Sequence, residues 1–223
     1  MFKKMFSVLL FSFLFFGVTA KAYRWCKVIF IGDFKSGKSE LIRAYFREPF
    51  YRGHDRTTDL FAREIVFNYN GENINLIIWD AVEEEEAHNV VNAFFCSSDI
   101  AFIVVDMYKL VESNFCINEI RNRIDRWADK LKQNASGCKV ILVGTKIDEI
   151  SGIDLERAKQ SLVFAANTMN NDFQDTQVIF VSAKCDRENA GLQINLSIVR
   201  AMTVLEYITW IRTTKTLECI LKR

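Results

Sequence analysis

The sequence lacks a strong excess of charge of either sign. Its 223 residues carry 29 lysines and arginines against 28 aspartates and glutamates, which gives a net charge of +1. We therefore expect no nucleic-acid partner, and no other partner class follows from the charge. Internal repeats and low-complexity linkers are also lacking. With a hydrophobic content of 50%, the chain is expected to form one globular domain with a sizeable core.

Cysteines at metal-binding spacings are lacking as well. Most of the six cysteines lie in or beside apolar runs, and they are widely spread, at positions 26, 96, 116, 138, 185 and 219. We interpret them as reduced residues of the core, with a disulfide framework as the alternative.

The chain begins with an apolar run that is short for a membrane span. Residues 5–20 carry no charge, follow two lysines and precede the small-residue pattern Ala20-Lys21-Ala22, as in a secretory signal peptide. The run has about 16 residues, whereas a bilayer span usually takes about 20. We expect residues 1–22 to be a cleaved signal peptide or a retained membrane anchor, and a mistaken start codon is a third explanation. The main domain is expected at 23–214 and a short tail at 215–223.

Apolar runs of strand length alternate with longer amphipathic stretches from Trp25 onward. This order is typical of βα repeats around a parallel sheet that is covered on both faces. Asn70-Gly71 favours a tight turn, so the two strands beside it are expected to pair antiparallel. The predicted strands lie at about 25–31, 65–68, 73–80, 100–106, 139–144 and 178–182, and the predicted helices at 39–47, 112–134, 154–170 and 194–212. The fold class is therefore α/β, with a six-stranded, mostly parallel sheet.

Residues 32–39 read GDFKSGKS, which has the spacing of a nucleotide phosphate loop. In such a loop backbone amides and the lysine hold phosphates, while the serine hydroxyl meets Mg²⁺. The motif lies between a predicted strand and a predicted helix, whose N-terminus would point at the phosphates. This order predicts a P-loop NTPase.

Two more motifs follow the fifth and sixth predicted strands. They are Gly144-Thr145-Lys146-Ile147-Asp148 and Ser182-Ala183-Lys184. Ligands bind at the carboxyl ends of strands in an open α/β sheet, so the three motifs are expected to converge on one edge. Either motif alone could be a strand end followed by a solvated turn. Together with the phosphate loop they indicate a nucleotide site.

With these motifs, residues 25–212 resemble the Ras superfamily of small GTPases, most like its Rab and Rho branches. The resemblance implies a small-GTPase fold that binds GTP or GDP with Mg²⁺. It also implies that Asp148 accepts hydrogen bonds from the N1 and N2 donors of guanine, which adenine lacks. The stems of Lys146 and Lys184 would lie along the base, and the Ala183 amide would reach the guanine oxygen. The implied nucleotide-binding residues are Gly32, Asp33, Phe34, Lys35, Ser36, Gly37, Lys38, Ser39, Glu40, Thr145, Lys146, Asp148, Ser182, Ala183 and Lys184.

The resemblance further implies a metal site formed by Ser39, Thr57 and Asp80. Trp79-Asp80 resembles the start of the family's WDTAGQE segment, in which the aspartate holds Mg²⁺ through a water. Thr57 stands eighteen residues after Ser39, where the family places the first-switch threonine that senses the γ-phosphate. Thr58 is the alternative, and an ordinary threonine pair in a polar loop is another.

The segment after Asp80 departs from the family pattern. Where the family reads Asp-Thr-Ala-Gly-Gln-Glu, this chain reads Asp-Ala-Val-Glu-Glu-Glu. Glu83 replaces a glycine that approaches the γ-phosphate, and two unit charges ~4 Å apart repel by about 4 kcal/mol at an effective dielectric of ~20. We therefore expect Glu83 to be displaced outward. Glu84 replaces the glutamine that orients the attacking water, but a carboxylate only accepts hydrogen bonds. Glu84 and Thr57 are the candidate catalytic residues.

The phosphate loop itself departs from the family at its centre. Phe34 stands where the family keeps a small residue, and its ring would occupy the space of the water or of a partner's arginine finger. These departures predict slow hydrolysis. Lys35 is hypothesised to pair with Glu83–Glu86 and to tether the second switch. The alternative is a solvated acidic patch, because exposed ion pairs contribute only ~0 to 1 kcal/mol.

The family's lipid-attachment signals are lacking at the C-terminus. Cys219 lies five residues from the end and has no paired terminal cysteine. Membrane association, if any, is expected through residues 5–20. GTP chemistry favours a membrane-associated protein facing a GTP-containing compartment, whereas the signal-like start favours export, and both remain open.

These observations predict a guanine-nucleotide switch that hydrolyses GTP slowly. Effector or regulator proteins are expected to read it through switch loops at 50–60 and 81–95. The alternative function is a non-cycling pseudo-GTPase that uses the fold as a binding scaffold.

Overall fold

The computed structural model describes residues 24–51, 61–69, 72–80, 94–114, 116–169, 173 and 176–202. Within them lies a six-stranded sheet with the order β2-β3-β1-β4-β5-β6. The strands are β1 Arg24–Gly32, β2 Phe61–Tyr69, β3 Glu72–Asp80, β4 Ile100–Asp106, β5 Lys139–Thr145 and β6 Gln177–Phe180. β2 and β3 pair antiparallel, and every other neighbouring pair is parallel. The predicted α/β class, the mostly parallel sheet and the hairpin are confirmed.

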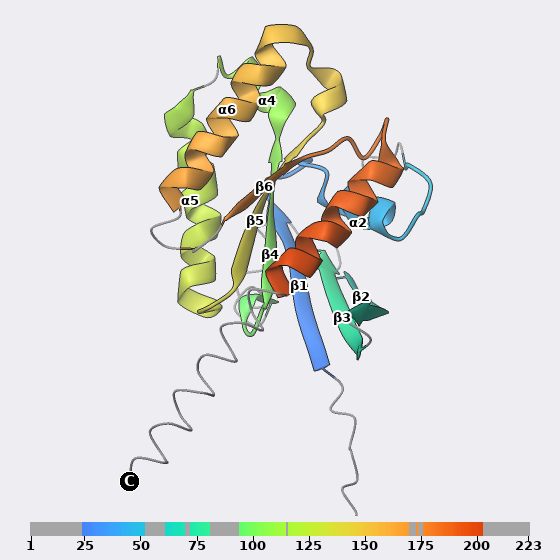
Figure 1. The fold of residues 1–223 in the computed structure, drawn as a ribbon. Coiled ribbons are helices and arrows are strands. Elements are labelled where there is room, and N and C mark those ends of the chain that lie inside the picture. Colours follow the sequence, from blue (N-terminus) through green and yellow to red (C-terminus); the bar gives the residue numbers. More distant parts are fainter. Residues whose placement is uncertain are drawn as a thin grey trace, which may run out of the picture.

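Helices cover both faces of the sheet (Figure 1). The side chains of β1 point alternately to the two faces. Ile29 and Ile31 pack with α4 (Met107–Glu112), α5 (Ile117–Asn134) and α6 (Gly152–Met169). Val28 and Phe30 pack on the opposite face with α2 (Lys38–Tyr45) and with the final helix, which is described over 187–202. The two faces form two separate buried clusters that share the strands between them.

Two helix predictions need correction. The amphipathic segment at 112–134 does not form one helix, because Asn114 adopts a left-handed φ of 51° and α4 ends at Glu112, so α5 begins only at Ile117. The final helix begins at residue 187, seven residues before the predicted start. The Asn189 amide donates to the Asp186 carboxylate at 3.2 Å, which is an N-cap that starts the helix at this point.

The cysteine interpretation is confirmed in one respect and wrong in another. The five described cysteines are thiols and not disulfides, as expected, but Cys96, Cys116 and Cys185 are exposed and, of the five, Cys26 and Cys138 alone belong to the core. Residues 1–22, interpreted as a signal peptide or anchor, and the tail 215–223 lie outside the described residues. Among the helices that the structure describes, none has the length and apolarity of a membrane span.

Candidate functional site

The phosphate loop joins the end of β1 to the start of α2. Gly32, Lys35 and Gly37 adopt φ values of 142°, 60° and 96°, and these left-handed residues turn the backbone sharply. A Cβ atom on Gly32 would lie 2.3 Å from the carbonyl oxygen of Val104 in β4. The first glycine of the motif is therefore required by the close approach of a neighbouring strand.

Lys38 is buried and turns back over the loop. Its Nζ donates to the carbonyl oxygens of Gly32 at 2.9 Å and Asp33 at 3.0 Å. These bonds hold a positive charge against the loop. The N-terminus of α2 adds positive potential at the same place, since its first amides lack partners within the helix. The arrangement suits a phosphate group.

A carboxylate and a hydroxyl meet beside the loop. Asp80 ends β3, lies opposite Phe30 of β1 and receives a hydrogen bond from the Ser39 side chain. Burial raises the pKa of Asp80, and the Ser39 hydrogen bond and the charge of Lys38 act in the opposite direction. Among the described residues, no group hydrogen-bonds to the buried Oδ1 atom of Asp80. Buried polar atoms are seldom left unsatisfied, so this oxygen is suited to a ligand from outside the protein.

Thr145 connects the phosphate loop to the carboxyl end of β5. Its Oγ1 lies 2.6 Å from the Ser36 carbonyl oxygen and 3.1 Å from that of Val105. One hydroxyl proton can be donated to only one of them at a time, and the shorter distance favours Ser36. This contact fixes the phosphate loop relative to the loop that carries Lys146 and Asp148.

The loops after β5 and β6 also contact each other. Asp148 lies in the short helix η1 (Ile147–Glu149), and its Oδ2 accepts a hydrogen bond from the Cys185 thiol at 3.4 Å. The Cys185 amide donates to the Ser182 hydroxyl at 2.9 Å. Lys146 has a φ of 57°, and its Nζ donates to Asp106 Oδ2 at 2.6 Å. The Lys146 ammonium is therefore anchored to the end of β4.

The remaining predicted residues divide into two groups. Ala183 is half-buried and Lys184 is exposed in the loop after β6. The contact of Cys185 with Asp148 brings this loop close to Asp148. Thr57 and Glu84 lie outside the described residues, as do the alternative Thr58 and the glutamates at 83–86. The proposed pairing of Lys35 with those glutamates therefore stays a prediction.

In the described part, Lys35 Nζ lies 5.0 Å from the ring centroid of Phe34, a cation–π contact, and Phe34 is 41% exposed.

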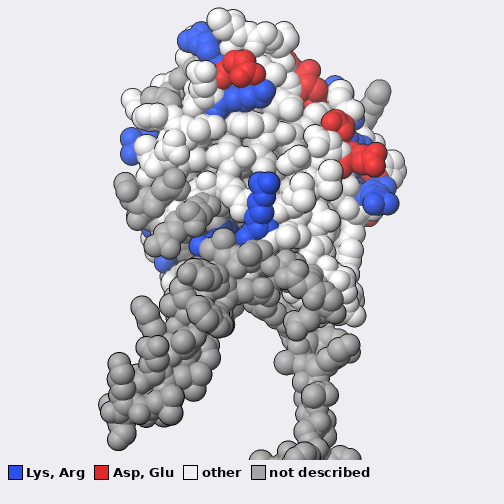
Figure 2. All heavy atoms as spheres, in the orientation of Figure 1, with Lys and Arg blue, Asp and Glu red and all other residues white. Residues whose placement is uncertain are grey.

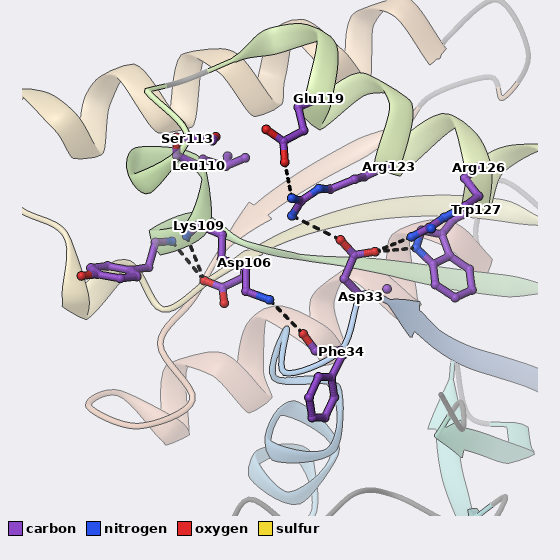
Figure 3. A network of polar contacts seen from close by, with 12 residues as sticks. Asp33, Phe34, Asp106, Lys109, Leu110, Ser113, Glu119, Arg123, Arg126 and Trp127 are labelled. Atoms are coloured by element: carbon purple, nitrogen blue, oxygen red, sulfur yellow. Dashed lines mark hydrogen bonds and ion pairs between the residues drawn. The ribbon is translucent and has the colours of Figure 1, made fainter. Parts of the chain in front are cut away.

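A polar network behind the phosphate loop was not foreseen from the sequence. Three side chains of α5 point toward the Asp33 carboxylate in Figure 3: Arg126 donates at 2.8 Å, Trp127 Nε1 at 3.4 Å, and Arg123 forms an ion pair at 3.4 Å. The motif gave a role to the backbone of Asp33, but the partners of its side chain lie about 90 positions further along the chain. No local pattern links such distant residues.

A second contact of this kind comes from α4. Lys109 Nζ donates to the Phe34 carbonyl oxygen at 3.2 Å (Figure 3). The Asp106 carboxylate caps α4 by accepting from the Tyr108 and Lys109 amides at 3.1 and 3.4 Å. Asp106 thus holds both the helix that contacts the phosphate loop and the ammonium of Lys146.

The nucleotide-type geometry at the carboxyl edge of the sheet agrees with the similarity of the chain to known proteins. A family model described as "Ras of Complex, Roc, domain of DAPkinase" matches residues 27–148, which are more than half of the chain and include most of β1 and all of β2 to β5. The chain belongs to the Ras superfamily of small GTPases. Its membership confirms the resemblance inferred from the motifs.

Among its relatives, this small GTPase is similar to several Rab proteins. Ras-related protein Rab-36 of Homo sapiens is 28% identical over 152 residues, which are 66% of this chain and 53% of that protein. Ras-related protein RabT2 of Dictyostelium discoideum is 26% identical over 168 residues, 73% of this chain and 69% of that protein. Ras-related protein RABA4b of Arabidopsis thaliana is 28% identical over 133 residues, 59% and 56% of the two chains. The chain spans about half the length of the human relative.

Membership in the superfamily implies GTP or GDP and Mg²⁺ as ligands, and the residues present fit the metal. Mg²⁺ prefers hard oxygen ligands and keeps several waters, so it binds through one or two protein oxygens and the phosphates. The Ser39 hydroxyl and the unsatisfied, buried Asp80 Oδ1 provide such oxygens beside Lys38. Among the described residues no group of three or more metal-binding side chains occurs, and this small-GTPase type of site does not need one.

Proposed function

We propose that this small GTPase binds GTP and GDP with Mg²⁺ and acts as a nucleotide-dependent switch that hydrolyses GTP slowly. The observation that carries the proposal is the contact of all three motifs at one edge of the sheet. Thr145 Oγ1 lies 2.6 Å from the carbonyl oxygen of Ser36, and the Cys185 thiol lies 3.4 Å from Asp148. One nucleotide can therefore touch the phosphate loop and both base loops, which are the segments at 144–148 and 182–184.

Each group has a defined role in the proposed binding. Lys38 and the amides of the phosphate loop hold the β- and γ-phosphates, and Asp148 accepts two hydrogen bonds from guanine. Adenine offers no such donors, so the Asp148 carboxylate would stay unsatisfied against it, which gives the choice of base. Ser39, Asp80 and Thr57 would hold Mg²⁺, whose charge offsets that of the phosphates.

The proposed switch works through the loops at 50–60 and 81–95. The γ-phosphate would favour one arrangement of these loops through Thr57 and the second switch, and effector or regulator proteins would recognise that arrangement. Rab-like relatives support this kind of partner, without indicating which one. The partners are therefore proposed only as proteins that contact these two loops.

Slow hydrolysis follows from three residues. The Phe34 ring would occupy the space of the attacking water, Glu83 replaces the glycine that would approach the γ-phosphate, and Glu84 cannot donate the hydrogen bond that positions the water. We expect single-turnover GTP hydrolysis by the full chain to be well below that of a small GTPase with glutamine at this place. Glu84→Gln combined with Phe34→Gly is expected to raise the rate, and Lys38→Ala provides the control without phosphate binding. Wild-type hydrolysis at an ordinary rate, or a large stimulation by a generic activating protein, would contradict the prediction.

A second candidate is a pseudo-GTPase that binds partners without cycling. The same substitutions, Phe34, Glu83 and Glu84, favour it. Chromatography of nucleotide released from the purified, denatured chain separates the candidates. Released GDP indicates turnover, released GTP indicates a switch arrested in one state, and the release of neither, with no guanine preference over adenine in calorimetry, indicates a scaffold.

A further inference from the structure

One arginine beside the base loop at 182–184 contacts three separate segments of the chain. Arg187 is the first residue of the final helix, and its guanidinium is half-buried. Nη1 donates to the Ala183 carbonyl oxygen at 2.7 Å and to Glu40 Oε2 at 3.1 Å. Nε and Nη2 both donate to the Glu48 carbonyl oxygen, at 3.0 and 2.6 Å. All three guanidinium nitrogens are therefore occupied by groups from the base loop, from α2 and from the segment after α2.

The close packing of two helices brings Arg187 within reach of these groups. Gly191 lies one turn after Arg187 on the same side of the final helix, and a Cβ atom there would lie 3.0 Å from the Ala44 carbonyl oxygen of α2. Only glycine leaves this space open. On the side of the molecule where α2 and the start of the final helix lie, acidic and basic side chains stand next to each other (Figure 2).

The segment after α2 is held by the same group of side chains. The Arg187 guanidinium lies 5.7 Å from the ring centroid of Phe50, a cation–π distance. The Tyr51 amide donates to Glu40 Oε2 at 3.3 Å, the oxygen that also accepts from Arg187. The ion pair of Arg187 with Glu40 therefore helps to hold residues 48–51, together with Arg63 and Arg43, which form ion pairs with the Glu48 carboxylate. Residues 48–51 lead directly into the first switch loop.

The ion pair also matters for the phosphates. Glu40 follows Ser39 in the first turn of α2, where a carboxylate beside a triphosphate would repel it. Arg187 at 3.1 Å and Arg43 at 3.6 Å both compensate this charge. The side chains of Arg187 and Glu40 are each only 19% exposed, so their pair is only weakly screened by solvent. Arg187 thus helps to remove an electrostatic penalty at the start of the helix that faces the phosphates.

We propose that Arg187 is a positioning residue that couples the base loop at 182–184 to residues 48–51, which overlap the start of the first switch loop at 50–60. The inference rests on the proposed nucleotide binding and deepens it. When guanine contacts the Ala183 amide, the opposite side of the same residue stays bonded to Arg187, which holds Glu48 and Glu40. Base binding and order at the start of the switch therefore support each other.

Nucleotide dissociation provides the first test. The full chain is loaded with a fluorescent GDP analogue, and its release is followed for wild type, Arg187→Ala, Arg187→Lys and the remote control Arg121→Ala on α5. Loss of hydrogen bonds from a charged group is expected to accelerate release about tenfold in Arg187→Ala. Arg187→Lys keeps the charge but cannot reach three acceptors, so it should be intermediate. The control should match wild type.

Hydrogen exchange provides the readout that a purely structural role would not change. GDP is expected to slow exchange of the Tyr51 amide in wild type and in Arg121→Ala, and to do so much less in Arg187→Ala and Arg187→Lys at equal thermal stability. If Arg187→Ala does not fold, the lysine variant carries the test. Equal release and equal protection in all variants would overturn the coupling alone. A wild-type chain that binds no guanine nucleotide would overturn the proposed function, and the coupling with it.

Discussion

Gly32 has the strictest steric requirement of the residues around the phosphate loop. Its φ of 142° is open to glycine, and the Val104 carbonyl oxygen occupies the place of a Cβ atom at 2.3 Å. The obstructing atom is backbone, so no side-chain rotation can relieve the contact. The glycine therefore serves two needs, the turn of the loop and the close approach of β4.

Replacement of this residue should be costly. We expect Gly32→Ala to destabilise the fold by roughly 2–4 kcal/mol, because backbone strain and overpacking add. Gly137→Ala is a matched control: Gly137 has a φ of 89°, but nothing lies within 4 Å of its Cβ position, so only the left-handed penalty of about 1–2 kcal/mol applies. Urea unfolding of the full chain measures both. Equal losses for the two variants would show that the contact with Val104 is unimportant.

Other residues of the site differ in how far the sequence predicts their contacts. The fixed spacing of the motif predicts that Lys38 faces the loop, and its bonds to Gly32 and Asp33 agree with that. No spacing predicts the ion pair of Lys146 with Asp106, which are 40 positions apart. Such contacts depend on the order of strands in the sheet, which brings β4 beside β5.

At the level of elements, most strands and helices could be predicted to within about two residues at each end, but β2 begins at Phe61, four residues before the predicted strand at 65–68. Apolar runs of β-branched residues bounded by polar ones predict β4 at 100–106 with both ends correct. The amphipathic pattern at 112–134 continues across the turn at Asn114, so periodicity alone cannot separate α4 from α5. The apolar spacing in the final helix is clear only from Ile194 onward, because its first turn carries Arg187 and other polar residues that serve contacts outside the core.

The packing of the final helix on α2 can be tested at Gly191. We expect Gly191→Val to destabilise the fold by roughly 1–3 kcal/mol, because its side chain would press on the Ala44 backbone. Valine is a better helix former than glycine by a few tenths of a kcal/mol, which offsets only a small part of this loss. Leu192→Val, at a position that is 52% exposed, is the control for a β-branched residue in the same turn. Thermal unfolding compares them, and an unchanged Gly191→Val would mean that the helices do not approach so closely.

At the scale of the whole molecule, one sheet organises both the core and the site. The carboxyl ends of its parallel strands bring together the phosphate loop, which begins at Gly32, and the loops at 144–148 and 182–184. The motifs predict this convergence, because each follows a strand. The side-chain bonds that hold the loops, from Asp33 to α5 and from Arg187 to Glu48, depend on helix packing and have no signature in the sequence.

The reactivity of the cysteines shows whether the buried clusters on the two faces of the sheet unfold together. Cys26 and Cys138 are buried in the clusters on opposite faces, and burial raises the pKa of the Cys138 thiol far above its usual range. A higher pKa means less reactive thiolate at pH 8, so burial protects Cys138 in two ways. We expect iodoacetamide at pH 8 to label Cys96, Cys116 and Cys185 in the folded chain, and Cys26 and Cys138 only in denaturant. Peptide mass spectrometry over a urea series measures the labelling. If Cys138 reacted at a clearly lower urea concentration than Cys26, the buried cluster under α5 and α6 would unfold separately, which would contradict a single cooperative unfolding of both clusters.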